Sequence, residues 1–145
     1  MKTSDVIIVG SGASGLFNAL FLPQDYKVIV ITKKEVEESD SFLAQGGISA
    51  LKNPEDYDSY FEDTMKAGHD ENDKGAVEKM IKESPQIIQD LKDFGVRFDL
   101  KDGEIEFTRE GGHSTFRILH HEDLTGKEIT SHLYLSLIHI SEPTR

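Results

Sequence analysis

The sequence predicts an α/β fold that opens with a parallel β-α-β unit. Val6 to Val9 and Val28 to Ile31 are short runs of β-branched residues, which favour strands covered on both faces of a parallel sheet. Between them, apolar residues recur at helical spacing from Ala13 to Phe21 and stop before Pro23. Residues 5 to 32 therefore have the length of one unit of about 30 residues. The usual right-handed crossover makes its two strands parallel.

The turn between the first strand and the helix has the sequence Gly10-Ser11-Gly12-Ala13-Ser14-Gly15. Gly10 permits a tight turn, Gly12 lets a diphosphate approach the backbone, and Gly15 lets helix and strand pack closely. The first N–H groups of the helix would face that diphosphate. The turn indicates a Rossmann-like dinucleotide site, and the alternative is a glycine-rich turn without a ligand.

The residues after the second strand depart from the pattern of NAD-binding proteins. Those proteins usually place an acidic residue there to bind the ribose hydroxyls, whereas this chain has Thr32-Lys33-Lys34. A lysine at this point is compatible with a 2′-phosphate or with one group of flavoproteins. The turn alone leaves the choice of dinucleotide open.

The middle of the chain is expected to be mostly helical. Residues 33 to 47 lack periodicity and are predicted to be a loop that orders on binding. A stripe of Tyr57, Tyr60, Phe61, Met65 and Ala67 indicates a helix whose apolar face belongs to the core. From Asn72 to Phe94 the pattern favours two helices, because Ser84-Pro85 suits an N-cap followed by the first helical residue, and Gly95 ends the second. The acidic helices are expected to present solvated faces.

Two further elements follow from turn and cap signals. Val96 to Leu100 and Ile105 to Phe107 are predicted to be short strands of a hairpin, because Asp102-Gly103 favours a tight reversal. Thr125 and Glu128 have the spacing of a capping box, so a last helix is expected to begin there.

Composition excludes several function classes. The 145 residues carry 16 Lys plus Arg against 27 Asp plus Glu, a net charge of −11, which disfavours nucleic acid as a partner. The chain has no Cys, which excludes disulfides, thiolate metal sites and a Cys nucleophile. No apolar run approaches the roughly 18 residues of a membrane span, and no leader is evident. We expect a cytoplasmic protein that binds neither nucleic acid nor membrane.

Three sets of residues resemble one protein family. They are the glycine turn, the segment from Ser39 to Ile48 with its Ala44-Gln45-Gly46-Gly47, and the run from Thr108 to Ser114 followed by Arg117 to His120 and Asp123 to Gly126. Together they resemble the succinate dehydrogenase/fumarate reductase flavoprotein superfamily, and within it the L-aspartate oxidase family. The resemblance covers about residues 4 to 133.

The resemblance implies FAD as cofactor and oxidation of L-aspartate to iminoaspartate, in the bacterial route to quinolinate and NAD, with O2 or fumarate reoxidising the flavin. The alternatives are a soluble fumarate reductase or succinate dehydrogenase flavoprotein, and a nonenzymatic dinucleotide-binding module. The residues expected to bind FAD are Gly10, Ser11, Gly12, Ala13, Ser14, Gly15, Lys33, Asp40, Ser41, Phe42, Leu43, Ala44, Gln45, Gly46 and Gly47.

Two positions distinguish members of the superfamily. Asp40 stands where many membrane-bound members carry the His that binds flavin covalently, so FAD is expected to be noncovalent. Glu110 is absent from those members and would favour a substrate with an ammonium group; the resemblance implies that it orients the substrate. His113 and His120 are expected to be packing or solvent residues. No metal site is expected, because six scattered His without Cys lack ligand spacing.

The end of the chain differs in character from the rest. Residues 135 to 145 read LSLIHISEPTR, which resembles the translation of a sequencing-library adapter. We expect residues 1 to 134 to be the N-terminal part of an incomplete FAD-binding domain, and residues 135 to 145 to be a non-native tail. The resemblance then implies that most catalytic residues lie beyond this fragment, which is expected to be inactive alone.

Overall fold

The computed structural model describes residues 3–141, which form two compact units. The first unit contains residues up to Gly46, Phe94–Val96, and the chain from Leu124 onward. The second unit contains Gly47–Asp93 and Arg97–Asp123. Each unit has its own elements and is described by itself.

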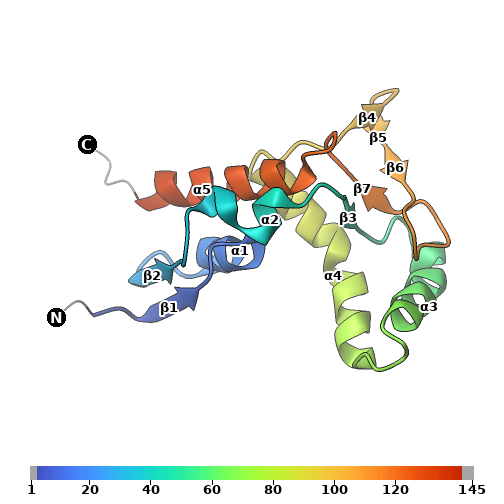
Figure 1. Ribbon diagram of the computed structural model, residues 1–145, viewed down its shortest axis with the longest axis horizontal. Coiled ribbons are helices and arrows are strands. Elements are labelled where there is room, and N and C mark those ends of the chain that lie inside the picture. Colours follow the sequence, from blue (N-terminus) through green and yellow to red (C-terminus); the bar gives the residue numbers. More distant parts are fainter. Residues whose placement is uncertain (1–2, 142–145) are drawn as a thin grey trace. The chain divides into compact units, whose positions relative to one another are not determined.

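The first unit begins with the predicted parallel β-α-β arrangement. Strand β1 (Val6–Val9) is followed by helix α1 (Ala13–Phe21) and strand β2 (Val28–Ile31) (Figure 1). The strands are parallel, with Val6 opposite Val28 and Val9 opposite Ile31. Leu22 is extended at the C-terminal cap of α1, as expected for a residue before proline. The fold class predicted from the sequence is therefore confirmed.

The prediction that these strands are covered on both faces is wrong. Burial alternates along β1, with Ile7 58% and Val9 84% exposed. Helix α1 contacts both strands, and within residues 3–141 nothing buries the face that carries Ile7 and Val9. A continuous β-branched run places apolar side chains on both faces of a strand. Such a run therefore cannot tell one-sided from two-sided burial.

The predicted loop over residues 33 to 47 contains two helical turns. They are the 3-10 helix η1 (Val36–Glu38) and the short helix α2 (Asp40–Leu43). Ser39 caps α2, because its Oγ accepts a hydrogen bond from the Phe42 N–H at 3.2 Å. One turn is too short to produce a helical repeat in the sequence, which is why periodicity failed here.

The last helix, α5 (Thr125–Ser141), begins where the capping spacing predicts and packs against α1 and α2 (Figure 1). Gly126 makes the contact with α2 possible: a Cβ at this position would meet the carbonyl oxygens of Ser41 and Ala44. Ser141-Glu142-Pro143 is expected to end this helix, because proline disfavours helical geometry in the residue before it; Glu142 and Pro143 lie outside the described residues. Along the expected tail, Leu135 and Ile140 are about half exposed.

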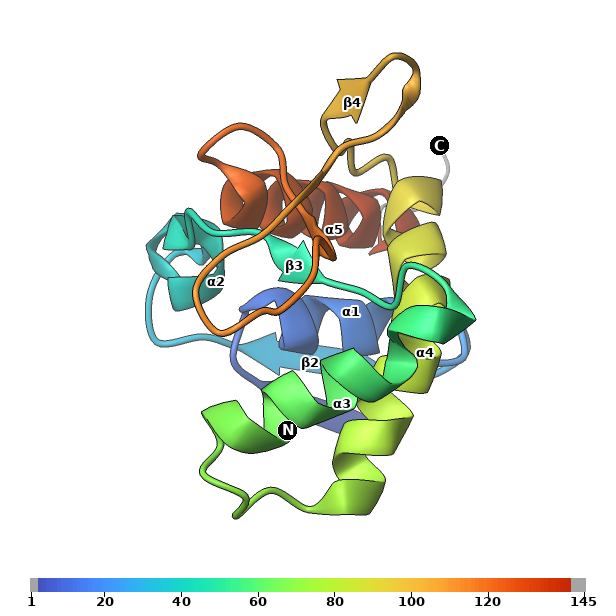
Figure 2. The same ribbon diagram turned by 90° about the vertical axis from the view of Figure 1, so that its right-hand side faces the viewer.

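The second unit is built on two helices that lie side by side (Figure 2). The 3-10 helix η2 (Pro54–Asp56) leads into α3 (Tyr57–Ala67), and α4 (Lys74–Asp93) follows. Their shared core contains Tyr60, Met65, Val77 and Ile81. The predicted apolar stripe of the first helix is thus a core face.

Helix α4 is one continuous helix, so the predicted division at Ser84-Pro85 is wrong. Proline lacks the N–H that would bond to the carbonyl four residues earlier, which here belongs to Ile81. The Ser84 hydroxyl donates to that carbonyl at 2.7 Å and accepts from the Leu51 N–H at 2.8 Å. Because Ser84 satisfies the group that Pro85 leaves unbonded, the helix continues.

The remaining strands are short and antiparallel. Strands β4 (Leu100–Lys101) and β5 (Glu104–Ile105) form a hairpin at the predicted turn, where Asp102 and Gly103 both have positive φ, as in a type I′ turn. The predicted strand ranges are wrong: residues 96–99 are not a strand, and Phe107 belongs to another sheet. A second sheet places β7 (Ile118–Leu119) between β3 (Ile48–Ser49) and β6 (Phe107–Thr108). The sequence did not indicate β7. Across residues 3–141, no helix has the length and apolar character needed to cross a membrane.

Candidate functional site

The glycine turn of the first unit depends on missing side chains. Gly10 has φ +114°, a conformation that other residues rarely adopt. A Cβ on Gly15 would collide with the carbonyl oxygen of Gly10, and a Cβ on Gly12 would lie 2.8 Å from Ser41 Oγ. The geometry of the turn therefore requires glycine at Gly10 and Gly15, whereas a Cβ at Gly12 would need only the Ser41 hydroxyl to move.

The turn leaves the N-terminus of α1 open toward a cavity. Gly12 caps the helix with extended backbone and without a side-chain hydrogen bond, so no cap side chain competes for the first N–H groups. The cavity has a volume of about 510 Å³ and is lined by the turn, by β1 and by Ser41. Free helix N–H groups beside a glycine backbone suit an anionic diphosphate, so these residues fit the dinucleotide that the sequence predicts.

Ser11 connects the turn to the end of β2. Its Oγ lies 2.8 Å from Thr32 Oγ1, and Thr32 donates its own proton to the carbonyl oxygen of Lys34 at 2.7 Å. Ser11 must therefore be the donor to Thr32. This chain of hydrogen bonds fixes the backbone on either side of Lys33, whose side chain is exposed.

The structure brings part of the segment from Asp40 to Gly47 to the turn. Ser41 faces Gly12, Asp40 is exposed in the first turn of α2, and Leu43 is 63% exposed. The Ala44 carbonyl accepts a hydrogen bond from the Gly126 N–H at 3.0 Å. Among the other residues of this segment, Phe42 is half-buried, and Gln45, Gly46 and Gly47 are exposed.

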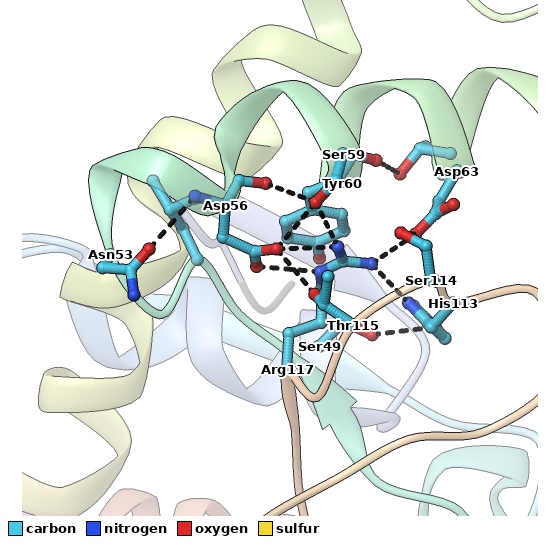
Figure 3. Close-up of polar contacts among 12 residues, drawn as sticks. Ser49, Asn53, Asp56, Ser59, Tyr60, Asp63, His113, Ser114, Thr115 and Arg117 are labelled. Atoms are coloured by element: carbon cyan, nitrogen blue, oxygen red, sulfur yellow. Dashed lines mark hydrogen bonds and ion pairs between the residues drawn. The ribbon is translucent and has the colours of Figure 1, made fainter.

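The second unit contains a buried charged cluster centred on Arg117, whose side chain is fully buried (Figure 3). Asp56 binds it in a bidentate pair, with Oδ2 2.9 Å from Nε and Oδ1 2.8 Å from one terminal nitrogen. Asp63 Oδ2 contacts the other terminal nitrogen at 2.6 Å. The guanidinium also lies over the ring of Tyr60, 4.8 Å from its centroid. Two carboxylates and an aromatic face thus surround one cation.

The ion pairs shift the pKa values of the groups in this cluster. Hydrogen bonding to Arg117 lowers the pKa of Asp56 from 3.8 to about 2, although burial opposes the shift. Burial also acts to raise the pKa of Asp63, but hydrogen bonds from Ser114 and Arg117 outweigh it and lower that pKa. The Asp56 hydrogen bond raises the pKa of Arg117. The cluster therefore holds its charges through the neutral pH range.

Glu110 lies in the segment that joins β6 to β7, on the same connection as Arg117. Glu110 is exposed, and its carbonyl oxygen accepts a hydrogen bond from the His113 N–H at 3.2 Å. Gly112 has φ +87° within this turn. A cavity of about 600 Å³ lies between the two helices and the backbone of Gly111 to His113. Of the two histidines singled out from the sequence, His113 joins the Arg117 cluster, and His120 contacts Asp99 at 3.2 Å.

Sequence reasoning missed Asp56 and Asp63 as partners of a buried cation. Both lie in the acidic region that was predicted to be a solvated face, and for these two carboxylates that prediction is wrong. In the sequence, Arg117 stands out only as part of the family resemblance. Its partners are 61 and 54 residues away in sequence, so local charge counting could not pair them.

Comparisons with known proteins agree with these features. The family described as FAD binding domain matches residues 5–144. An L-aspartate oxidase of Clostridium acetobutylicum is 44% identical over 132 residues, which are 90% of this chain and 30% of that protein. An L-aspartate oxidase of Clostridium perfringens is 42% identical over 128 residues, which are 88% of this chain and 29% of that protein. The chain thus spans less than a third of the length of these relatives.

Solved structures show the same fold. The Mycobacterium smegmatis Sdh1 complex with UQ1 superposes with a TM-score of 0.84 at 32% identity, over 93% of this chain and 24% of that one. The E. coli quinol fumarate reductase FrdA gives a TM-score of 0.88 at 24% identity, over 95% of this chain and 24% of that one. Since the family match spans nearly the whole sequence, this chain belongs to the FAD binding domain family.

Proposed function

We propose that the complete protein is an FAD-dependent L-aspartate oxidase that forms iminoaspartate for NAD biosynthesis in the cytoplasm. One observation carries the proposal: a glycine turn that excludes Cβ atoms opens a helix N-terminus to a cavity, in a chain 44% identical to an L-aspartate oxidase. The chain spans 30% of that relative. We therefore assign the reaction to the complete protein, which would supply the remaining catalytic groups.

The cofactor residues follow from the first unit. Residues 10 to 15 would hold the diphosphate, Lys33 would lie toward the ribose, and residues 40 to 47 would contact the flavin. Asp40 cannot form the covalent link that a histidine makes in some relatives of the superfamily, so FAD would be held noncovalently. Acid precipitation of the complete protein should then release all of its flavin. Flavin retained in the washed precipitate would contradict a noncovalent site.

Glu110 would select the substrate. Aspartate differs from succinate by an ammonium group, and a carboxylate near that group favours the amino acid. The exposure of Glu110 beside a glycine turn leaves its side chain accessible to a ligand. We assign Glu110 the role of orienting L-aspartate through its ammonium group.

Oxidation of the Cα–N bond of aspartate to an imine requires a hydride acceptor, which is the chemistry that FAD supplies when bound. This chain contributes position and charge: the glycine turn would orient the dinucleotide, and Glu110 would orient the substrate. O2 or fumarate would reoxidise the flavin. The protein needs neither nucleic acid nor a membrane partner for this reaction.

The test is Glu110→Gln in the complete protein, which keeps the shape of the side chain and removes its charge. We expect kcat/KM for aspartate to fall roughly 10- to 100-fold, equivalent to about 1.4 to 2.7 kcal/mol. FAD content should not change. An equal loss of fumarate reduction would show that Glu110 supports the fold of its segment and does not select the ammonium group.

A second candidate is a fumarate reductase or succinate dehydrogenase flavoprotein, favoured by the 32% identity to Mycobacterium smegmatis Sdh1. The two functions differ in the electron donor. Under this second candidate, succinate would reduce the flavin and aspartate would not. A nonenzymatic dinucleotide-binding module would respond to neither compound.

We also propose that residues 135 to 145 are not native to the protein. The proposal rests on the resemblance of this string to a translated sequencing-library adapter; within its described part, Leu135 and Ile140 are about half exposed, and Leu137 and Ile138 are partly buried. Resequencing the locus from genomic DNA with a different library chemistry is the test. A reading frame that continues past Tyr134 with other residues supports the proposal, whereas the same LSLIHISEPTR ending and a stop codon would overturn it.

A further inference from the structure

The guanidinium of Arg117 uses every donor it has. An arginine carries five N–H donors and no acceptor. Nε bonds to Asp56, one terminal nitrogen bonds to Asp56 and Ser59, and the other bonds to Asp63 and His113 (Figure 3). The contact with Ser59 is 2.8 Å and the contact with His113 Nδ1 is 3.2 Å. No N–H of this buried cation lacks an acceptor.

This arrangement fixes the tautomer of His113. Because arginine cannot accept a hydrogen bond, Nδ1 of His113 must be the acceptor in their contact. In the neutral ring the proton then resides on Nε2, which lies 3.4 Å from Ser49 Oγ. Arg117 therefore sets which edge of the imidazole donates.

The same carboxylates that bind Arg117 also hold the segment from Glu110 to Thr115. Asp63 Oδ2 accepts from both the N–H and the hydroxyl of Ser114, at 2.7 and 2.8 Å. Asp56 Oδ1 accepts from the Thr115 hydroxyl at 2.6 Å. Arg117 forms ion pairs with both carboxylates and holds them in place. The conformation of the segment thus depends on this arginine.

We propose that Arg117 and His113 are positioning residues that hold the Glu110 segment in the conformation needed for substrate recognition. The proposal rests on the proposed function, because it assigns a purpose to the placement of Glu110. An apolar core of the same volume is often as stable as a buried ion pair. An apolar core could not, however, orient an imidazole or hold a polar turn by its N–H and hydroxyl groups.

The test compares two substitutions of His113 in the complete flavoprotein. His113→Asn retains an acceptor near the position of Nδ1, whereas His113→Gln moves its amide toward the position of Nε2 and loses the contact with Arg117. Because a misplaced Glu110 weakens substrate binding, we expect His113→Gln to raise KM for aspartate about tenfold with kcat within about twofold. His113→Asn should keep KM within about threefold of the parent. Lys79→Gln, on the exposed face of α4, is the matched surface control.

A double-mutant cycle with Glu110→Gln separates positioning from a general structural effect. If His113 acts through Glu110, the KM effect of His113→Gln should largely disappear in the Glu110→Gln background. An undiminished effect in that background would overturn the positioning role. If the parent protein does not oxidise aspartate, the proposed function itself fails. If the parent oxidises aspartate and Glu110→Gln does so at the parental rate, only the role of Glu110 and the positioning role that depends on it fail, so the two failures are distinguished.

The tautomer gives a readout that does not depend on activity. Histidine-labelled protein should show the His113 ring as the Nε2–H tautomer by NMR, with its signals identified by their loss in His113→Asn. The Nδ1–H tautomer in the parent would overturn the proposal. Unchanged flavin content in both His113 variants would show that the cofactor site remains intact.

Discussion

The two units build their sites in opposite ways. In the first, the Gly10 to Gly15 turn depends on residues without side chains, because Cβ atoms added at Gly12 and Gly15 would meet a neighbouring side chain and the backbone. In the second, the guanidinium of Arg117 depends on side chains that bind it, because each of its N–H donors has an acceptor. The first site should therefore be broken by adding atoms and the second by removing them.

The largest expected effect is the loss of the cation at Arg117. Arg117→Met would leave Asp56 and Asp63 buried without their partner, and removing one member of a buried pair costs about 3–5 kcal/mol. The free energy of unfolding of the complete protein, measured in urea, should fall by that amount. Lys82→Met is the matched control, because Lys82 and Glu78 form an exposed pair, and exposed pairs contribute little to stability. An equal loss of unfolding free energy in Arg117→Met and Lys82→Met would show that the buried cluster stabilises the fold no more than the exposed pair does.

The corresponding addition in the first unit is Gly15→Ala. The new Cβ would collide with the Gly10 carbonyl, and overpacking of this kind costs about 1–3 kcal/mol. Since the collision displaces the helix that faces the cofactor, flavin content should fall by about tenfold, the equivalent of 1.4 kcal/mol. Absorbance of the purified protein gives the ratio of flavin to polypeptide.

Gly75→Ala provides the matched control for that addition. A Cβ at Gly75 would meet only the flexible Asp73 side chain, at 3.3 Å. Alanine in the first turn of α4 should leave stability equal or raised by about 0.5–1 kcal/mol. Full flavin content in Gly15→Ala would contradict the requirement for glycine at the turn.

Acid should weaken the second site. The pKa of Asp56 is lowered from 3.8 to about 2 in the folded chain, so its ionised form stabilises the fold at pH values above 3.8. That contribution to the free energy of unfolding, about 2 kcal/mol, is lost as the pH falls from 3.8 toward about 2. Unfolding free energies measured across this interval should drop less steeply in Asp56→Asn. Identical slopes in the parent and in Asp56→Asn would contradict this assignment.

The smallest expected effect is that of Ser11→Ala. This change removes one hydrogen bond to Thr32 and should cost about 1 kcal/mol. The same substitution in a Thr32→Val background should cost less, because the partner is already absent. Thermal unfolding of the four proteins gives the coupling, and purely additive losses would show that the bond does not stabilise the turn.

Local signals predicted most of the first unit and one hairpin of the second. The glycine turn, the parallel strands and the Asp102-Gly103 hairpin are encoded by neighbouring residues, so the sequence reveals them. The division at Pro85 failed because the hydroxyl of Ser84 replaces the missing N–H. The Arg117 cluster could not be predicted, because it pairs residues 54 and 61 positions apart. Exposure of Ile7 and Val9 was missed because their residue types suit either face of a strand.

The most direct test of the account is anaerobic addition of L-aspartate to the oxidised complete flavoprotein, followed through the visible absorption of the flavin. We predict that aspartate bleaches the flavin, that succinate does so far more weakly, and that Glu110→Gln slows bleaching by aspartate while FAD stays bound. Bleaching by succinate with no response to aspartate would contradict the account.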